Sequence, residues 1–163
     1  MSRGKILRPS DLEERFRSEP KTRDGLVLAN GLFDLLHVGH VRYLEGARAE
    51  GRALLVAVNS DESARRLKGP GRPVVPLEER LEMLAALECV DWVTWFEEDN
   101  VERLLRSLRP AVHAKGTDYT EATVPERGVA QELGIRTAIV GDPKGHASSD
   151  VIRRIRSTPA EAP

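Results

Sequence analysis

Leu26-Val27-Leu28-Ala29 is a short apolar run that ends in Asn30-Gly31. A run of this length that is closed by turn residues is typical of a buried strand. Apolar positions at helical spacing follow in residues 38–50, and Ala53-Leu54-Leu55-Val56-Ala57-Val58 is a second apolar run. This order predicts a strand, a helix and a second strand that lies parallel to the first.

The same alternation continues toward the end of the chain. Further apolar strands are expected at residues 92–96, 111–114 and 135–140, and helices are expected at residues 76–87, 100–108, 125–133 and 148–156. Strands that are apolar throughout need cover on both faces of their sheet. We therefore expect an α/β protein with a Rossmann-like, doubly wound parallel sheet of five strands in a single domain. Ligands of such sheets bind beyond the carboxyl ends of the strands.

The chain divides into three segments by composition. Residues 1–24 are polar and charged, and their pattern predicts an N-terminal helical lead. Residues 25–156 carry the expected strands and form the domain proper, whereas residues 157–163 are expected to be a disordered tail. One compact domain suits a length of 163 residues.

Composition argues against several classes of protein. The 25 basic and 26 acidic residues are spread along the chain and give a net charge of -1, so no basic footprint for nucleic acid is expected. No apolar stretch approaches the ~18–20 residues of a membrane span, and the N-terminus lacks the apolar core of a signal peptide. A single cysteine, Cys89, cannot form an intrachain disulfide and is interpreted as a packed thiol. We expect a cytoplasmic protein.

His37-Val38-Gly39-His40 lies between the first strand and the helix that follows it. The N-terminus of a helix points N–H groups at a bound anion, and a glycine lets the backbone approach a phosphate closely. Two imidazoles there can donate hydrogen bonds to phosphate oxygens where charge develops in a transition state. Phosphate chemistry is favoured over a metal pair, for which Asp34 is the nearest third ligand; no dedicated metal site is expected.

The longer stretch from Asn30 to His40, Asn-Gly-Leu-Phe-Asp-Leu-Leu-His-Val-Gly-His, resembles the signature of the cytidylyltransferase-like superfamily of nucleotidyltransferases. The series is similar to the adenylyltransferases of ADP-heptose synthesis over about residues 5–156, through Val58-Asn59-Ser60-Asp61-Glu62, Arg65-Arg66-Leu67-Lys68-Gly69, Arg72-Pro73, Glu79-Arg80 and Lys115-Gly116-Thr117-Asp118-Tyr119. The resemblance implies an enzyme that transfers AMP from ATP to a sugar 1-phosphate, such as heptose 1-phosphate, and releases pyrophosphate.

The resemblance also implies roles for individual residues. His37 and His40 would contact the triphosphate and the departing pyrophosphate, Lys68 would swing over the phosphates, and Arg80 would clamp the triphosphate or the second substrate. Further positions would bind nucleotide or sugar phosphate: Asn30, Gly31, Phe33, Asp34, Gly39, Lys115, Gly116, Asp118, Ser148 and Ser149. Mg²⁺ would arrive with the triphosphate. His146 is a candidate phosphate contact, and the family is compatible with a homodimer.

Several residues leave alternatives open. Arg80 could instead pair with a neighbouring glutamate, Ser148 or Ser149 could be only a helix cap, and His113, which has apolar neighbours, is interpreted as a core residue. Departures from the heptose pattern leave the acceptor open, namely Thr117, Gly141-Asp142-Pro143-Lys144 and Asp150. The alternatives are a cytidylyltransferase, using CTP, that acts on glycerol 3-phosphate or another polyol phosphate, and a non-catalytic nucleotide-binding module.

Overall fold

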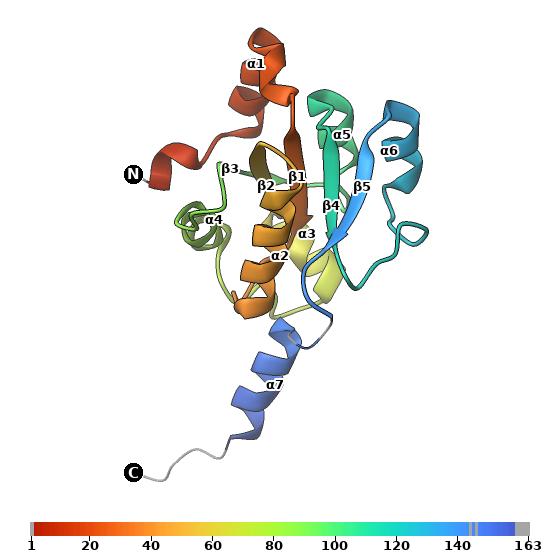
Figure 1. Ribbon diagram of the computed structural model, residues 1–163. Helices are drawn as coiled ribbons and strands as arrows, with labels where there is room; N and C mark the ends of the chain where they lie inside the picture. Colours follow the sequence, from red (N-terminus) through yellow and green to blue (C-terminus); the bar gives the residue numbers. More distant parts are fainter. Residues whose placement is uncertain (1, 144, 146, 159–163) are drawn as a thin grey trace.

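The computed structural model describes residues 2–143, 145 and 147–158. Five strands lie in this part of the chain, and all of them pair in parallel in one sheet with the order β3-β2-β1-β4-β5 (Figure 1). They are β1 (Leu26–Gly31), β2 (Ala53–Asn59), β3 (Trp92–Phe96), β4 (Val112–Gly116) and β5 (Arg136–Val140). The predicted Rossmann-like sheet of five parallel strands is confirmed.

The order of the strands reverses beside β1. The chain first builds outward from β1 through β2 to β3, and it then crosses back to place β4 on the other side of β1. The connections that leave β1 and β4 therefore diverge, which opens a crevice beyond the carboxyl ends of these two strands. The residues at that crevice are Asn30 and Gly31 on β1 and Lys115 and Gly116 on β4.

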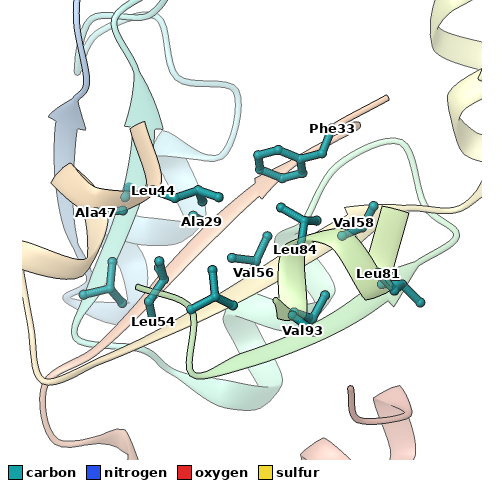
Figure 2. Packing of buried hydrophobic residues seen from close by; sticks show 14 of the residues in the cluster. Ala29, Phe33, Leu44, Ala47, Leu54, Val56, Val58, Leu81, Leu84 and Val93 are labelled. Carbon is teal, nitrogen blue, oxygen red and sulfur yellow. The ribbon is translucent and has the colours of Figure 1, made fainter. Parts of the chain in front are cut away.

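Helices cover both faces of the sheet. The described residues form α1 (Pro9–Ser18), α2 (Val38–Ala49), α3 (Asp61–Lys68), α4 (Leu77–Ala85), α5 (Glu102–Leu108), α6 (Arg127–Leu133) and α7 (Ser148–Ser157), with 3-10 turns at Ser2–Lys5 and Pro20–Arg23. On one face, Leu44 of α2 and Leu84 of α4 pack with Phe33 against Val56 of β2 (Figure 2). The opposite face is covered by apolar side chains of α1, α5 and α6.

The two ends of the chain differ in how they meet this core. Leu12 and Phe16 of α1 are fully buried, and Ile6 forms an isolated parallel bridge with Val93 beside the edge strand β3. At the other end, α7 projects beyond the carboxyl edge of the sheet, and none of its residues is buried (Figure 1). Ser157 is the last residue of α7 and not the start of a disordered tail, because the helical hydrogen bonds continue to it. Residues 159–163 of the predicted tail lie outside the described residues.

No helix in the described part of the chain is long and apolar enough to cross a membrane.

Candidate active site

An open cavity of about 620 Å³ lies at the carboxyl edge of the sheet. It is lined by nearly every residue that the sequence predicted for the site: Asn30, Gly31, Phe33, Asp34, His37, Gly39, His40, Lys68, Lys115, Gly116, Asp118, Ser148 and Ser149. Residues more than a hundred positions apart in the sequence therefore meet in one place. Of the predicted site residues, Arg80 is not part of the lining.

The two motif histidines stack on each other at the start of α2. Their ring centroids are 3.9 Å apart and the ring planes differ by 21°. His37 is the residue that precedes the helix, and its backbone carbonyl accepts the hydrogen bond from the His40 amide. Burial, with a smaller contribution from His37, lowers the pKa of His40 to about 4. His40 is therefore a neutral imidazole near pH 7, which donates or accepts a hydrogen bond without carrying charge.

The loop between β1 and α2 turns sharply at Phe33. Phe33 has a positive φ of 50°, a conformation that costs a non-glycine residue on the order of 1–2 kcal/mol. Its ring is buried, stacks on Tyr43 and lies 5.3 Å from the His40 ring. Tyr43 is fixed in turn because its hydroxyl donates to the Ala114 carbonyl of β4. Phe33 and Tyr43 thus pack beside His40 and connect α2 to the sheet.

Asp34 connects this loop to the loop of residues 69–75. Its carboxylate is 1% exposed and accepts three hydrogen bonds, from Arg72 Nε at 2.6 Å and from the amides of Val74 and Val75. Both carboxylate oxygens are therefore engaged by the protein. Asp34 thereby orders the turn after β1, and its carboxylate has little freedom to act as a metal ligand.

Arg80 lies beneath the cavity and not in its wall. Its side chain is fully buried in α4 and donates to Val75 O, to Leu32 O and to Asp61 Oδ1. The alternative of a pairing with a neighbouring glutamate is not what the structure has, because the carboxylate that Arg80 meets belongs to Asp61. As placed, the guanidinium braces the loop after β1, and contact with a phosphate would require it to leave these three acceptors.

Lys115 and Glu126 form a buried ion pair at the end of β4. Lys115 Nζ lies 3.6 Å from Glu126 Oε2 and 4.6 Å from the centre of the Tyr119 ring. Burial lowers the pKa of Lys115, and Glu126 acts in the opposite direction. Glu126 lines the cavity and was missed in the sequence, because only the folded path from β4 to the start of α6 brings it beside Lys115, 11 positions earlier in the chain.

His113 is fully buried on β4, as expected for a core histidine, but it also touches the site. Its Nε2 lies 2.9 Å from Asn30 Oδ1 at the end of β1. Since that oxygen only accepts, the ring nitrogen is the donor. Burial, the largest effect, lowers the pKa of His113 to about 4, so this histidine is also neutral near pH 7.

The segment after β5 supplies the last wall of the cavity. Gly141, with φ of 97°, lets the chain pass 3.2 Å from Tyr43 Cα, measured from the position that a Cβ would occupy. Ser148 and Ser149 begin α7, and Ser148 Oγ donates to the Leu35 carbonyl at 3.0 Å. Asp150 pairs with Arg153 outside the cavity lining, so its carboxylate does not face the site. His146 and Lys144 lie outside the described residues.

No group of three or more potential metal ligands of the His, Cys, Asp or Glu type gathers among the residues that the structure describes.

A family model described as cytidylyltransferase-like matches residues 28–158, which include the whole cavity wall from β1 to α7. The chain belongs to the cytidylyltransferase-like family. It is accordingly a nucleotidyltransferase enzyme. In open α/β sheets, ligands bind at a crevice such as the one between β1 and β4.

Several curated proteins that are similar to this chain carry the name bifunctional protein HldE. The chain is 42% identical to the protein of Syntrophotalea carbinolica over 151 residues and 48% identical to that of Streptomyces coelicolor over 146 residues. These matches cover 93% and 90% of this chain but 31% of each relative. The chain thus spans about a third of the length of the curated relatives that it matches.

Solved structures with the same fold are more distant in sequence. The lipopolysaccharide core biosynthesis protein from Thermoplasma volcanium superimposes with a TM-score of 0.63 at 23% identity, covering 73% of this chain and 98% of that protein. Pantothenate synthetase from Thermus thermophilus gives a TM-score of 0.60 at 20% identity, covering 95% of this chain and 68% of that protein. These likenesses support the fold alone.

Proposed function

We propose that this enzyme transfers AMP from ATP to a sugar 1-phosphate, with heptose 1-phosphate as the first candidate, and releases pyrophosphate. The observation that carries the proposal is the stacked pair His37 and His40 at the start of α2, inside a cavity large enough for a nucleotide and a small acceptor. The choice of ATP and heptose phosphate rests on the resemblance of residues 5–156 and on the HldE relatives.

The proposed reaction is an in-line displacement at the α-phosphorus. A phosphate oxygen of the acceptor forms a new bond to the α-phosphorus, the bond from that phosphorus to the bridging oxygen breaks, and pyrophosphate leaves with the electron pair. The acceptor phosphate is already ionised, so no general base and no covalent enzyme intermediate is needed. Catalysis then depends on positioning and on stabilising charge as it develops.

His40 would stabilise that charge as a neutral donor. Its Nδ1 is buried and has no hydrogen bond to another described residue, which leaves Nε2 as the nitrogen for a ligand. A proton on Nε2 gives a preorganised N–H donor for a phosphate oxygen. Lys68, which is exposed at the end of α3 and lines the cavity, would add positive charge over the phosphates.

Mg²⁺ would enter with the triphosphate. This ion is commonly held by substrate phosphates with one or two carboxylates and several waters. The engaged carboxylate of Asp34 fits a substrate-borne ion better than a resident one. When bound, the ion would neutralise charge on the leaving pyrophosphate.

The test is pyrophosphate release in the presence of Mg²⁺ from ATP and from CTP, each with heptose 1-phosphate, glycerol 3-phosphate and other sugar phosphates. The expected result is release with ATP and heptose 1-phosphate. Release from CTP with glycerol 3-phosphate or another polyol phosphate would replace the proposal by the cytidylyltransferase alternative. Nucleotide binding without release for any pair would favour the non-catalytic module.

A further inference from the structure

Asn59, the last residue of β2, touches the cavity but was not among the predicted site residues. Only 3% of it is exposed, and its Nδ2 donates to Ser63 Oγ at 2.8 Å. Ser63 is fully buried, and its hydroxyl donates to the Glu98 carbonyl at 2.9 Å. A buried chain of hydrogen bonds therefore runs from the cavity wall through Ser63 to the segment after β3.

The donor and acceptor directions of these hydrogen bonds fix the orientation of the Asn59 carboxamide. A carbonyl only accepts, so the single hydroxyl proton of Ser63 is committed to Glu98. Ser63 Oγ must then accept from Asn59, which has to present its amide nitrogen to Ser63. Asn59 Oδ1 is consequently held on the other side of the carboxamide, and it makes no hydrogen bond to another described residue.

Asn30 provides the complementary case on the neighbouring strand. Its Oδ1 is taken by the buried His113, so its Nδ2 is the end without a described protein partner. Asn30 pairs in register with Ala57, two residues before Asn59, which places both asparagines on the same face of the sheet. Strand spacing and rise put their Cα atoms about 8 Å apart. One oriented acceptor, Asn59 Oδ1, and one oriented donor, Asn30 Nδ2, thus belong to two residues that both line the cavity.

We propose that Asn59 determines acceptor specificity by accepting a hydrogen bond from a hydroxyl group of the acceptor substrate, so that the enzyme selects polyhydroxylated phosphates. The inference rests on the proposed nucleotidyl transfer and deepens it. A hydroxyl suits this wall because it donates to Asn59 and accepts from Asn30 at the same time. An acceptor without that hydroxyl would leave a nearly buried carboxamide oxygen without a partner, which disfavours its binding.

The test pairs an enzyme variant with altered acceptors. Pyrophosphate release is measured for the wild type and for Asn59→Ala with the preferred sugar phosphate and with its series of monodeoxy analogues. We expect Asn59→Ala to lower kcat/KM for the intact acceptor about 10-fold, with the KM for ATP unchanged. For the one analogue that lacks the recognised hydroxyl, the variant and the wild type should be equal within about 2-fold, because the lost contact is the same.

Ser63→Ala tests whether the carboxamide has to be held in place. It should lower kcat/KM in the same acceptor-dependent way but less than Asn59→Ala does. Asn59 keeps its Oδ1 in this variant and loses only the hydrogen bond to Ser63 that orients the carboxamide. Ser107→Ala is the matched control, since Ser107 donates to a carbonyl within α5, and it should leave kcat/KM unchanged.

Equal losses on every analogue, or a loss that appears in the KM for ATP, would overturn the inference while pyrophosphate release by the wild type upholds the proposed function. If the wild type releases none, the proposed function fails on its own. The affinity of polyol phosphates is then measured by calorimetry with a non-hydrolysable ATP analogue. Weaker binding by Asn59→Ala than by the wild type would support the inference, and equal or undetectable binding by both would overturn it.

Discussion

Two parts of the cavity wall are built differently. The pocket floor is defined as the carboxyl ends of β1, β2 and β4 with the loops of residues 32–37 and 69–75. It holds buried polar groups that bond to the protein itself, such as the Asp34 carboxylate and the carboxamide of Asn59. The arm, defined as residues 141–143, 145 and 147–158, has no buried residue in α7. Among the described residues, few polar contacts join the arm to the rest of the protein: Ser148 Oγ donates to Leu35 O, Thr117 Oγ1 donates to Asp142 O, and Arg42 pairs with Asp142.

This difference separates stability from affinity. A change in the pocket floor removes a partner from a buried polar group, so it should lower the free energy of unfolding even without substrate. A substitution in the arm removes few contacts of the folded chain, so it should leave the free energy of unfolding nearly unchanged. Its effect should appear only in the affinity for a ligand.

Asp34→Ala should lower the free energy of unfolding by about 3–5 kcal/mol, because it leaves Arg72 and two amides without their buried acceptor. Urea unfolding of the unliganded protein measures it. The matched control is Asp150→Ala in the arm, which breaks an exposed pair with Arg153 and should cost less than about 0.5 kcal/mol. Similar losses for the two variants would refute the contrast.

His40→Ala should lower turnover about 100-fold or more, which is the effect of losing one preorganised donor. The change in unfolding free energy should be small by comparison, because His40 Nδ1 has no hydrogen bond to a described residue that would be lost. Steady-state pyrophosphate release gives the turnover. A variant that turns over at nearly the normal rate would remove His40 from the mechanism.

Arg80→Ala should lower the free energy of unfolding by about 2 kcal/mol, since three acceptors lose their buried donor. The loss of stability would mark Arg80 as a brace of the pocket floor. The competing role, a clamp on the triphosphate, predicts instead a stable variant with a raised KM for ATP. Urea unfolding and ATP kinetics on the same preparation separate the two.

Acid should weaken the fold through His113. Its pKa is about 4 in the folded protein and about 6.5 when unfolded, so between these values the unfolded chain binds the proton that the folded chain excludes. The free energy of unfolding should therefore fall as the pH drops from about 6.5 toward 4. His113→Leu should reduce this slope without abolishing it, because the pKa of His40 is lowered too. An unchanged slope in His113→Leu would show that protonation of His113 does not contribute to the loss of stability in acid.

Ile155→Ser in the arm should change the free energy of unfolding by no more than about 0.5 kcal/mol, because the side chain is 65% exposed. Urea unfolding at several protein concentrations measures it. A loss above 1 kcal/mol that depends on concentration would mean that α7 is covered by a second copy of the chain, the homodimer that the family resemblance allows.

The sequence predicted the parts of this protein that depend on neighbours along the chain. The apolar runs gave the strands, and the alternation with helices gave the parallel sheet, because both signals are local. The histidine pair was found for the same reason, since its residues are three positions apart. The predicted site residues that line the cavity lie together because the carboxyl ends of parallel strands share one edge of the sheet.

Residues whose role depends on distant partners were harder to predict. Arg80 was expected in the cavity, yet it meets Leu32, 48 positions away, only after α4 packs against the sheet. The pairing of Asn30 with His113 depends on β4 lying next to β1, an order that no local pattern encodes. The ion pair of Glu126 with Lys115 depends on how the chain returns from β4 to the start of α6. Asn59 stood inside a matching motif, but its significance lies in the hydrogen bond to Ser63, which requires the turn into α3.

The proposed function requires transfer of the α-phosphorus of the nucleotide at this cavity. It is tested most directly with ATP labelled at the α-phosphorus, Mg²⁺ and heptose 1-phosphate, by following where the label goes in the wild type and in His40→Ala. We expect label in a sugar nucleotide and none in pyrophosphate, with transfer about 100-fold slower in the variant. Label that remains in ATP, ADP or free AMP, or equal transfer by both proteins, would contradict it.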